Sequence, residues 1–342
     1  MTHRAGLTKP PIKRTSVVRR IPPIAHIRHR ASPGLEGDVC LFELAAESAP
    51  IVVEADSGRP MTLLPGDRFL AVPGYRESTR WVVGGIPHGG LLPGHDYWVL
   101  ADCGVVGELI GNSPLQKGHL APATYLGVIT GARGKSLNIR QFVETAGARA
   151  TDRRAPLFLV LGTSSEVGKT TAVVAVLRAL RQSGHSTLVA LKATGTSSIA
   201  EIAQYLDHGA THVFDCVDFG LPTTYPSDRR GMDAFFDAAL GRCLALPAHA
   251  VVVECGGDLF GANVPALLAC LMRRRAKPKV LLVAPDALAA LGAKQALRDL
   301  GISIDLITGP CTDTPTLLER TRTLCKIPAI NMMQWGGRAL PI

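Results

Sequence analysis

The stretch LGTSSEVGKTTAVVAVLRAL, residues 161–180, decides the fold of the C-terminal part of this 342-residue chain. The apolar run LFLVLG, residues 157–162, predicts a strand, and the residues after Gly168 have the composition of a helix. A glycine-rich turn between a strand and a helix, ending in Gly-Lys-Thr-Thr, is typical of a phosphate-binding loop. The usual loop has four residues between its first glycine and Gly-Lys, whereas five separate Gly162 from Gly168 here.

Such a loop binds phosphates through its backbone N–H groups and the positive end of the following helix. We expect Lys169 to contact the β- and γ-phosphates as a catalytic residue, and the Thr170 hydroxyl to bind Mg²⁺. The sequence lacks an Asn/Thr-Lys-x-Asp guanine-reading motif, so the expected cofactors are ATP and Mg²⁺. The alternative is a tight strand–helix turn without a ligand. The residues predicted to bind the cofactor are Gly162, Thr163, Ser164, Ser165, Glu166, Val167, Gly168, Lys169, Thr170 and Thr171.

Apolar strands alternate with helices from residue 157 onward. This alternation predicts an α/β fold, a P-loop NTPase domain over residues 157–342 with a parallel sheet flanked by helices. The predicted strands cover residues 157–162, 186–193, 249–255, 279–285, 303–309 and 328–333, and residues 211–219 are predicted to be extended. The predicted helices cover residues 169–183, 198–209, 231–246, 264–275, 286–301 and 314–325.

A different composition precedes this domain. Residues 36–130 contain short β-rich runs, such as VCLFEL and RFLAVPG, separated by glycine and proline. Turn signals at this spacing are typical of a small sandwich or barrel, so a smaller β-rich domain is predicted over residues 36–130. Residues 131–156 are polar and are predicted to form a linker with one short helix.

The net charge of +9 is concentrated at the N-terminus, where residues 1–35 contain eight Lys or Arg and no Asp or Glu. Prolines at 10, 11, 22 and 23 oppose a continuous helix. These features predict a basic, flexible tail over residues 1–35, and an organelle-targeting segment is the alternative. Because the basic residues belong to a tail rather than a folded surface, we do not expect nucleic acid as a partner.

No apolar run reaches the roughly 18 residues that span a bilayer, so no membrane association is expected. The eight cysteines are scattered and form no C-x-x-C pair. They are expected to be reduced core residues of a cytoplasmic protein rather than zinc ligands. The expected oligomer is a homodimer.

Three further positions have residue types suited to catalysis or metal binding. Glu254 ends the apolar run VVVE, where a carboxylate needs a partner. We expect it to be a second Mg²⁺ ligand, and the alternative is a salt bridge to a core Lys or Arg. Lys192 also ends a predicted strand. It is expected to be a catalytic, substrate-contacting residue, and the alternative is a solvated lysine at the strand end. Cys255 is expected to pack rather than act as a nucleophile. The candidate third metal ligand is Asp215, with Glu201, Asp207 and Asp218 as alternatives that could equally be helix caps or surface charges.

The segment GTSSEVGKTT resembles the loop of dethiobiotin synthetase and the cobyrinic acid amide synthases, which share the five-residue insert. STLVALKATGTSS, FDCVDFGLPTTYP and AHAVVVECGGDLFG follow in the family's order, and the resemblance covers about residues 157–310. The chain also resembles a related P-loop family, some members of which are linked to N-acetyl-D-glutamate formation. It departs from dethiobiotin synthetase at Ser164, Ala193 and Cys255. These departures bear on the identity of the substrate more than on the identity of the nucleotide.

The resemblance implies an ATP- and Mg²⁺-dependent ligase. Such an enzyme activates a small-molecule carboxylate or carbamate as an acyl phosphate, which an amine then attacks to form a C–N bond. Two other classes stay open: an acyl- or phosphoryl-transferase acting on an amino-acid-like substrate, and a regulatory nucleotide-hydrolysing switch.

Overall fold

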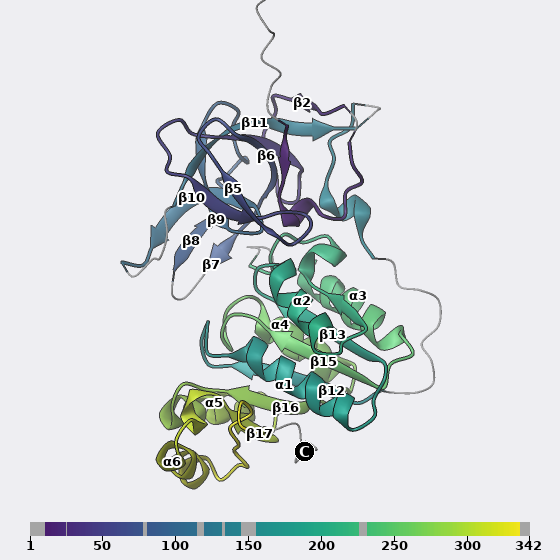
Figure 1. Ribbon diagram of the computed structural model, residues 1–342, viewed down its shortest axis with the longest axis vertical. Helices are drawn as coiled ribbons and strands as arrows, with labels where there is room; N and C mark the ends of the chain where they lie inside the picture. Colours follow the sequence, from purple (N-terminus) through teal and green to yellow (C-terminus); the bar gives the residue numbers. More distant parts are fainter. Residues whose placement is uncertain are drawn as a thin grey trace, which may run out of the picture.

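The computed structural model describes residues 11–24, 26–77, 81–114, 120–131, 134–144, 155–225 and 231–335. The N-terminal part of the chain forms a β-barrel and the remainder forms an α/β part, and the two are stacked along the long axis of the molecule (Figure 1). The predicted fold class, a parallel sheet flanked by helices and preceded by a β-rich part, is confirmed.

The barrel closes because β6 pairs with β3 on one side and with β10 on the other. β11 and β9 complete the ring, β1 pairs with β6, and β7 and β8 extend the sheet beyond β10. Closure pairs backbone groups that an open sheet would leave at its edges. The strands are β1 (Lys13–Arg14), β2 (Arg28–Arg30), β3 (Cys40–Leu44), β4 (Ile51–Glu54), β5 (Pro60–Leu63), β6 (Arg68–Pro73), β7 (Arg76–Glu77), β8 (Val82–Gly85), β9 (Asp96–Ala101), β10 (Val105–Asn112) and β11 (Pro122–Thr130).

The α/β part contains a parallel sheet in the order β14-β13-β15-β12-β16-β17. Its strands are β12 (Leu157–Gly162), β13 (Leu188–Thr194), β14 (His212–Phe214), β15 (Ala250–Cys255), β16 (Lys279–Val283) and β17 (Leu306–Thr308). Its helices are α1 (Lys169–Gln182), α2 (Ile199–Asp207), α3 (Met232–Ala245), α4 (Val264–Arg273), α5 (Ala287–Asp299) and α6 (Pro315–Cys325). None of the helices within the described ranges is long and apolar enough to cross a membrane.

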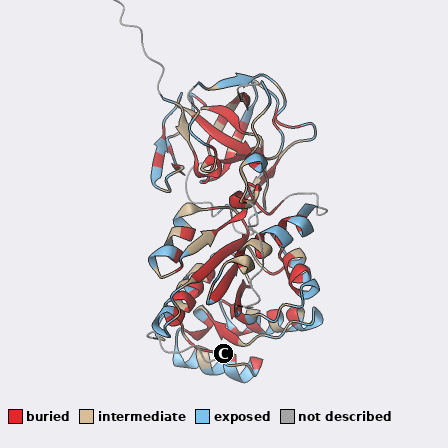
Figure 2. Ribbon diagram, turned by 90° about the vertical axis from the view of Figure 1, so that its right-hand side faces the viewer, coloured by how far each residue is buried: buried red, intermediate tan, exposed pale blue. Residues whose placement is uncertain are grey.

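Successive side chains of each strand point to opposite faces of this sheet, and helices pack against both faces. Leu159 and Leu161 of β12 pack in one cluster with residues of α3, α4 and α5. Phe158 and Val160 of the same strand pack in another cluster with residues of α1 and α2. Figure 2 shows the resulting layers, with buried strands in the middle and the outer faces of the helices exposed. All eight cysteines are buried and free, as predicted for core residues.

Two predicted elements differ from the structure. Residues 211–219 are not extended throughout, because the 3-10 turn η3 (Cys216–Phe219) follows β14 and the Asp215 carboxylate caps it. The strand predicted over residues 328–333 is reduced to one parallel bridge between Ile307 and Ala329. The Asn331 side chain accepts hydrogen bonds from the next backbone N–H groups, which turns the chain away from the sheet.

The predicted linker is folded in part. Residues 139–142 form the 3-10 helix η2 (Ile139–Phe142), whose N-terminus is capped by the Asn138 side chain. The remainder of the predicted linker includes residues 145–154, which lie outside the described residues.

The expectation of a flexible tail is wrong for residues 11–24. β1 pairs with β6 of the barrel, and Val17, Val18 and Ile21 are buried in a core cluster that spans the barrel and the α/β part. The sequence argument gave weight to the charge of this segment and overlooked the apolar residues between its arginines. Burial of those side chains is favourable and offsets the conformational entropy that the segment loses when it becomes ordered.

Arg19 joins this N-terminal segment to the α/β part. Its guanidinium lies 2.7 Å from Asp215 and 2.8 Å from Asp218, and Arg20 lies 3.2 Å from Asp218. Burial lowers the pKa of Arg19, but the two carboxylates outweigh this effect and raise it. Burial and the charge of Asp215 raise the pKa of Asp218, although both arginines oppose that shift. The basic segment is therefore a buried electrostatic contact between the two parts.

Glu54 makes a second contact between the parts, and here the barrel contributes an anion instead of a cation. This buried carboxylate at the end of β4 accepts hydrogen bonds from the backbone N–H groups of Ile199 and Ala200 at 2.9 and 2.7 Å, and from Ser198 Oγ at 3.2 Å. It also accepts from the hydroxyl of Ser16. A carboxylate at a helix N-terminus satisfies free N–H groups and interacts favourably with the helix dipole.

We expect Arg19→Ala to lower the free energy of unfolding by about 3–5 kcal/mol, because the change leaves the buried Asp215 without its cation and Asp218 with Arg20 alone. The native pKa of Asp218 is already raised, and loss of Arg19 raises it further. An acid with a raised native pKa loses stability as the pH rises through that pKa. The loss of unfolding free energy in Arg19→Ala should therefore be greatest at neutral pH and become smaller in acid.

Thermal unfolding from about pH 4 to about pH 8 checks this expectation. Arg28→Ala, on the exposed strand β2, is the control and should unfold like the unmodified protein. A deficit for Arg19→Ala that is the same at every pH would show that the carboxylates are not its cause.

Candidate functional site

The glycine-rich loop joins β12 to α1, and Lys169 is the first residue of the helix. Gly168 precedes it with φ of 97°, a left-handed conformation that favours glycine. The Lys169 ammonium donates hydrogen bonds to the backbone oxygens of Ser164 and Gly257, both at 2.8 Å. These carbonyls hold the ammonium beside the N-terminus of α1, where an anion is favoured.

Lys169 is only 6% exposed. Burial lowers the pKa of its ammonium, the Glu254 carboxylate opposes this shift, and the nearby Lys192 adds to it. A cation that has lost water interacts more strongly with a phosphate than a solvated surface lysine does. The loop therefore presents a desolvated positive charge that lacks a strong anionic partner of its own.

Glu254 lies at the end of β15, next to the loop strand, and is 2% exposed. One of its oxygens accepts a hydrogen bond from Thr170 Oγ1 at 3.3 Å, and the other accepts from the Tyr205 hydroxyl at 2.5 Å. Burial, followed by the charge of Glu254, raises the pKa of Tyr205, so the hydroxyl keeps its proton. Two hydroxyls, one from α1 and one from α2, thus donate to this carboxylate.

Thr170 and Glu254 fit a Mg²⁺ site that a nucleotide would complete. Mg²⁺ takes oxygen ligands and usually keeps waters and substrate phosphates besides one or two protein carboxylates. In the part of the chain that the structure describes, no group of three or more His, Cys, Asp or Glu could hold a metal ion. The paired hydroxyl and carboxylate therefore suit an ion shared with phosphates rather than an all-protein metal cage.

Lys192 lies opposite Glu254 in the register of β13 and β15, so the two residues reach the same edge of the sheet. Its side chain is buried and forms an ion pair with Glu201 from the first turn of α2. Glu201, one of the alternative metal ligands, thus balances the charge of Lys192 inside the site.

Two adjoining cavities meet at these residues. The phosphate cavity, of about 340 Å³, is lined by the glycine-rich loop, Glu254 and Gly257, and also by Arg76 and Trp81 of the barrel. The interdomain cavity, of about 320 Å³, lies between the barrel and the start of α2. Four residues line both cavities: Arg76, Lys192, Thr196 and Glu201.

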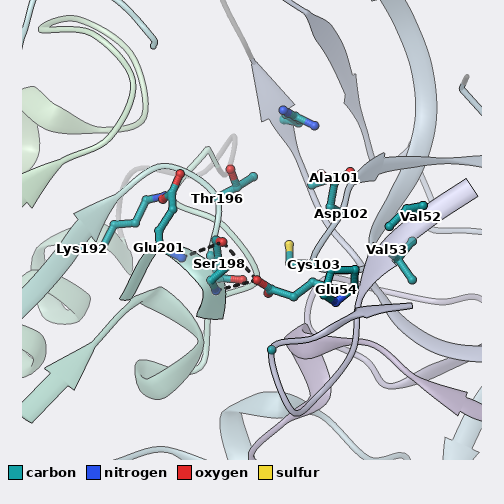
Figure 3. A pocket seen from close by; sticks show the side chains of 15 residues that line it. Val52, Val53, Glu54, Ala101, Asp102, Cys103, Lys192, Thr196, Ser198 and Glu201 are labelled. Carbon is teal, nitrogen blue, oxygen red and sulfur yellow. Dashed lines mark hydrogen bonds and ion pairs between the residues drawn. The ribbon is translucent and has the colours of Figure 1, made fainter. Parts of the chain in front are cut away.

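Figure 3 shows the interdomain cavity from close by. Lys192 and Glu201 lie on the side of the α/β part, and Asp102 and Cys103 lie on the barrel side. Glu54 reaches across from the barrel to the start of α2, where Ser198 lies. The cavity wall is therefore built by both parts of the chain.

The remaining metal-ligand candidates lie elsewhere. Asp215 and Asp218 are held by Arg19 and line neither cavity, so the expectation that Asp215 is the third metal ligand is corrected. Asp207 is exposed at the C-terminal end of α2. The ion pairs explain the error, since an aspartate beside an apolar run can equally serve a buried arginine from a distant segment.

Most of the predicted cofactor-binding residues surround the cavities. Ser165, Glu166, Gly168, Lys169 and Thr170 line the phosphate cavity. Val167 and Thr171 line a third cavity on the other side of the loop, of about 280 Å³. Gly162 lies beneath the lysine, and a Cβ there would lie 2.6 Å from Lys169 Cδ. Glu166 and Gly168 line both of these cavities, so they form the wall between them.

Sequence reasoning missed four aromatic or basic residues at the site: Arg76, Trp81, Tyr205 and Tyr225. Tyr225 lies in the segment FDCVDFGLPTTYP, which the resemblance placed on the substrate side, and this was the available signal. Arg76 and Trp81 belong to the barrel, and nothing in their sequence context indicates that they reach the loop.

The strand–loop–helix unit, with a lysine and threonine at the helix start and a glutamate at the end of the neighbouring parallel strand, defines a P-loop NTPase fold. No family model matches the chain, and none of the curated proteins matches it.

FtsY proteins are among the solved structures that resemble it. Chloroplast FtsY from Physcomitrella patens is 16% identical, with 56% of this chain and 62% of that chain covered and a TM-score of 0.37. FtsY from Thermotoga maritima is 18% identical, with 56% and 66% covered and a TM-score of 0.35. FtsY from Elizabethkingia anophelis in complex with GDP is 15% identical, with 56% and 61% covered and a TM-score of 0.34. The matches span less than two thirds of each of these three FtsY chains.

Lys169→Ala should abolish nucleotide turnover and leave the fold intact, because the loop lysine serves the phosphates as a charge. Phosphate release and the far-ultraviolet circular dichroism spectrum check the two parts of this expectation. Hydrolysis at the unmodified rate would show that the loop is not a nucleotide site.

Glu254→Gln keeps the side-chain shape and removes its charge. We expect the Mg²⁺ concentration needed for half-maximal activity to rise by about 10–100-fold or more, while nucleotide affinity changes much less. A Mg²⁺ titration of activity checks this, with Glu319→Gln on the exposed face of α6 as the control. An unchanged titration would mean that Glu254 only holds Tyr205 and Thr170 in place.

Proposed function

We propose that the protein is an ATP- and Mg²⁺-dependent ligase of the dethiobiotin synthetase type, which activates the carboxylate or carbamate of a small molecule for C–N bond formation. The observation that carries this proposal is the shared wall of the two cavities. Lys192, Glu201, Thr196 and Arg76 line both, so a small acid in the interdomain cavity would lie beside the phosphates of a nucleotide in the phosphate cavity.

The nucleotide would occupy the loop with its phosphates at Lys169 and the N-terminus of α1. Thr170 and Glu254 would hold Mg²⁺, which supplies positive charge against the phosphates when it is bound. The third cavity, beside Thr171, offers room for the base, and Val283, Met332 and Asn331 line it with both apolar and amide groups. The lack of a guanine-reading motif supports adenine as that base.

The substrate carboxylate would exchange places with Glu201 as the partner of Lys192. An ammonium already desolvated in the wall of the cavity suits an anion better than a surface lysine does. The lysine would then remain beside the carboxylate while negative charge moves onto the new acyl phosphate.

In the proposed reaction a carboxylate oxygen attacks the γ-phosphorus, the bond from that phosphorus to the β–γ bridging oxygen breaks, and ADP leaves with the electron pair. An amine nitrogen then attacks the acyl carbon and loses a proton to solvent. The bond between the acyl carbon and the phosphorylated oxygen breaks, and phosphate departs with an oxygen from the substrate. The chain's contribution is to position the reactants and to stabilise charge.

A screen of ATP turnover against small carboxylic acids and amino acids tests the proposal, with phosphate release as the readout. For an acid that stimulates turnover, heavy oxygen placed in its carboxylate should appear in the released phosphate. Mass spectrometry of the phosphate measures this transfer. Phosphate without the label would exclude carboxylate activation and favour plain hydrolysis or an acyl transfer that bypasses ATP.

Lys192→Ala should lower the acid-stimulated reaction by about 100-fold or more and change the affinity for ATP by much less. The reason is that Lys192 also lines the interdomain cavity, where the substrate is proposed to bind, whereas Lys169 lines only the phosphate cavity of the two. Lys279→Ala is the matched control, since this lysine lies exposed at the start of β16 in the same sheet. Equal losses of ATP affinity and of turnover in Lys192→Ala would place this lysine in nucleotide binding instead.

A further inference from the structure

The β7–β8 hairpin brings two barrel side chains to the phosphate cavity. β7 pairs with β8 in antiparallel register, and both strands lie on the side of the barrel that faces the α/β part (Figure 1). Arg76 of β7 and Trp81, just before β8, line the same cavity as Lys169 and Glu254. The indole N–H of Trp81 donates a hydrogen bond to the Glu166 carboxylate of the glycine-rich loop.

The loop is constrained where the hairpin meets it. Glu166 has φ of 58°, a left-handed conformation that is uncommon for residues with a Cβ. The hydrogen bond from Trp81 involves the side chain of this same residue. The barrel therefore contacts the phosphate-binding loop directly and contributes to the wall of the phosphate cavity.

Arg76 is the residue of this hairpin that carries a charge into the cavity. One of its terminal nitrogens donates to the backbone oxygen of Leu100, which fixes the guanidinium on the barrel. Burial raises the pKa of Tyr225, on the far wall of the cavity, to about 12, and the charge of Arg76 opposes that shift. The guanidinium therefore acts across the cavity on the α/β part.

Among the residues that the structure describes, the other two cations that line this cavity already have partners. Lys192 is paired with Glu201, and Lys169 is held by two backbone carbonyls. Within the described residues, no carboxylate forms an ion pair with Arg76 at 4.0 Å or less. A guanidinium has five N–H donors in a planar fork, so most of its donors are left for a ligand in the cavity.

We propose that Arg76 is a further catalytic residue, which the barrel supplies to the phosphate cavity to bind the transferring phosphoryl group. The inference rests on the proposed function, because it takes the γ-phosphate of ATP as the group that Arg76 contacts. The planar fork of arginine matches two phosphoryl oxygens at once. Charge that spreads over those oxygens during transfer would lie between Lys169 of the loop and Arg76 of the barrel.

This arrangement assigns a role to the barrel. An arginine that approaches the phosphoryl group from a separate structural unit stabilises the transition state more than the bound nucleotide. Removal of Arg76 should then lower turnover strongly and nucleotide affinity weakly. A residue that only supported the loop would alter both quantities together.

The test compares Arg76→Ala and Arg76→Lys with the unmodified full-length protein. The first readout is the affinity for a fluorescent ADP analogue with Mg²⁺, which we expect to change by less than about threefold. The second is the affinity for the same analogue with aluminium fluoride, a mimic of the transferring phosphoryl group, which should fall by about 100-fold or more in Arg76→Ala. Arg76→Lys keeps the charge without the fork and should recover only part of this loss.

Guanidinium ion added to Arg76→Ala should restore tight binding of the aluminium fluoride complex, since it replaces the missing group in the space the alanine leaves. Arg68→Ala, which removes a surface ion pair with Glu43 on the same barrel, is the control and should behave like the unmodified protein. If Arg76→Ala fails to fold, Arg76→Lys gives the decisive comparison.

The outcomes separate the two proposals. Failure of the unmodified protein to bind the ADP analogue would overturn the proposed function itself. Normal ADP binding together with equally tight aluminium fluoride complexes in all Arg76 variants would overturn the role of Arg76 alone. Parallel loss of both affinities without rescue by guanidinium would make Arg76 a structural support of the hairpin.

Discussion

The carboxylate of Glu54 at the N-terminus of α2 is the contact on which the site depends. It is buried, and the backbone N–H groups of Ile199 and Ala200 donate to it, so the helix satisfies both oxygens of the carboxylate. The helix that it anchors presents Glu201 to Lys192 and Tyr205 to Glu254. A residue of the barrel thus sets the position of the two groups that hold Lys192 and Glu254.

Arg19 also joins the two parts, through its ion pairs with Asp215 and Asp218. Both Arg19 and Glu54 are charged groups taken out of water at the junction of the two parts, and such groups are costly unless each finds its partner. Displacement of the barrel would separate Asp215 and Asp218 from Arg19, and Glu54 from the N-terminus of α2. The buried charges therefore favour one relative position of the two parts, the one in which each charge meets its partner. Apolar contacts alone would not select that position as strictly.

The fold of the α/β part could be predicted because its signals are local. The loop between β12 and α1 and the apolar run ending in Glu254 each occupy a few consecutive residues. The remainder of the site could not be predicted, because it depends on contacts between residues far apart in sequence. Arg19 meets Asp215 across 196 positions, and Trp81 meets Glu166 across 85. On composition alone, Arg19 is assigned to a flexible tail, although its neighbours Val17 and Val18 are core residues.

The barrel also matters for the fate of the proposed intermediate. An acyl phosphate is lost if water reaches it before the amine, so a ligase of this kind needs a site that excludes water during the reaction. The glycine-rich loop alone forms an open cradle on one part of the chain. Arg76, Trp81 and the wall containing Asp102 close the two cavities from the barrel side. A ligand bound between Lys169 and the barrel contacts both parts, and by linkage it must favour the docked arrangement over any in which they separate. Nucleotide binding and protection of the intermediate would then depend on the same buried contacts, those of Glu54 and Arg19.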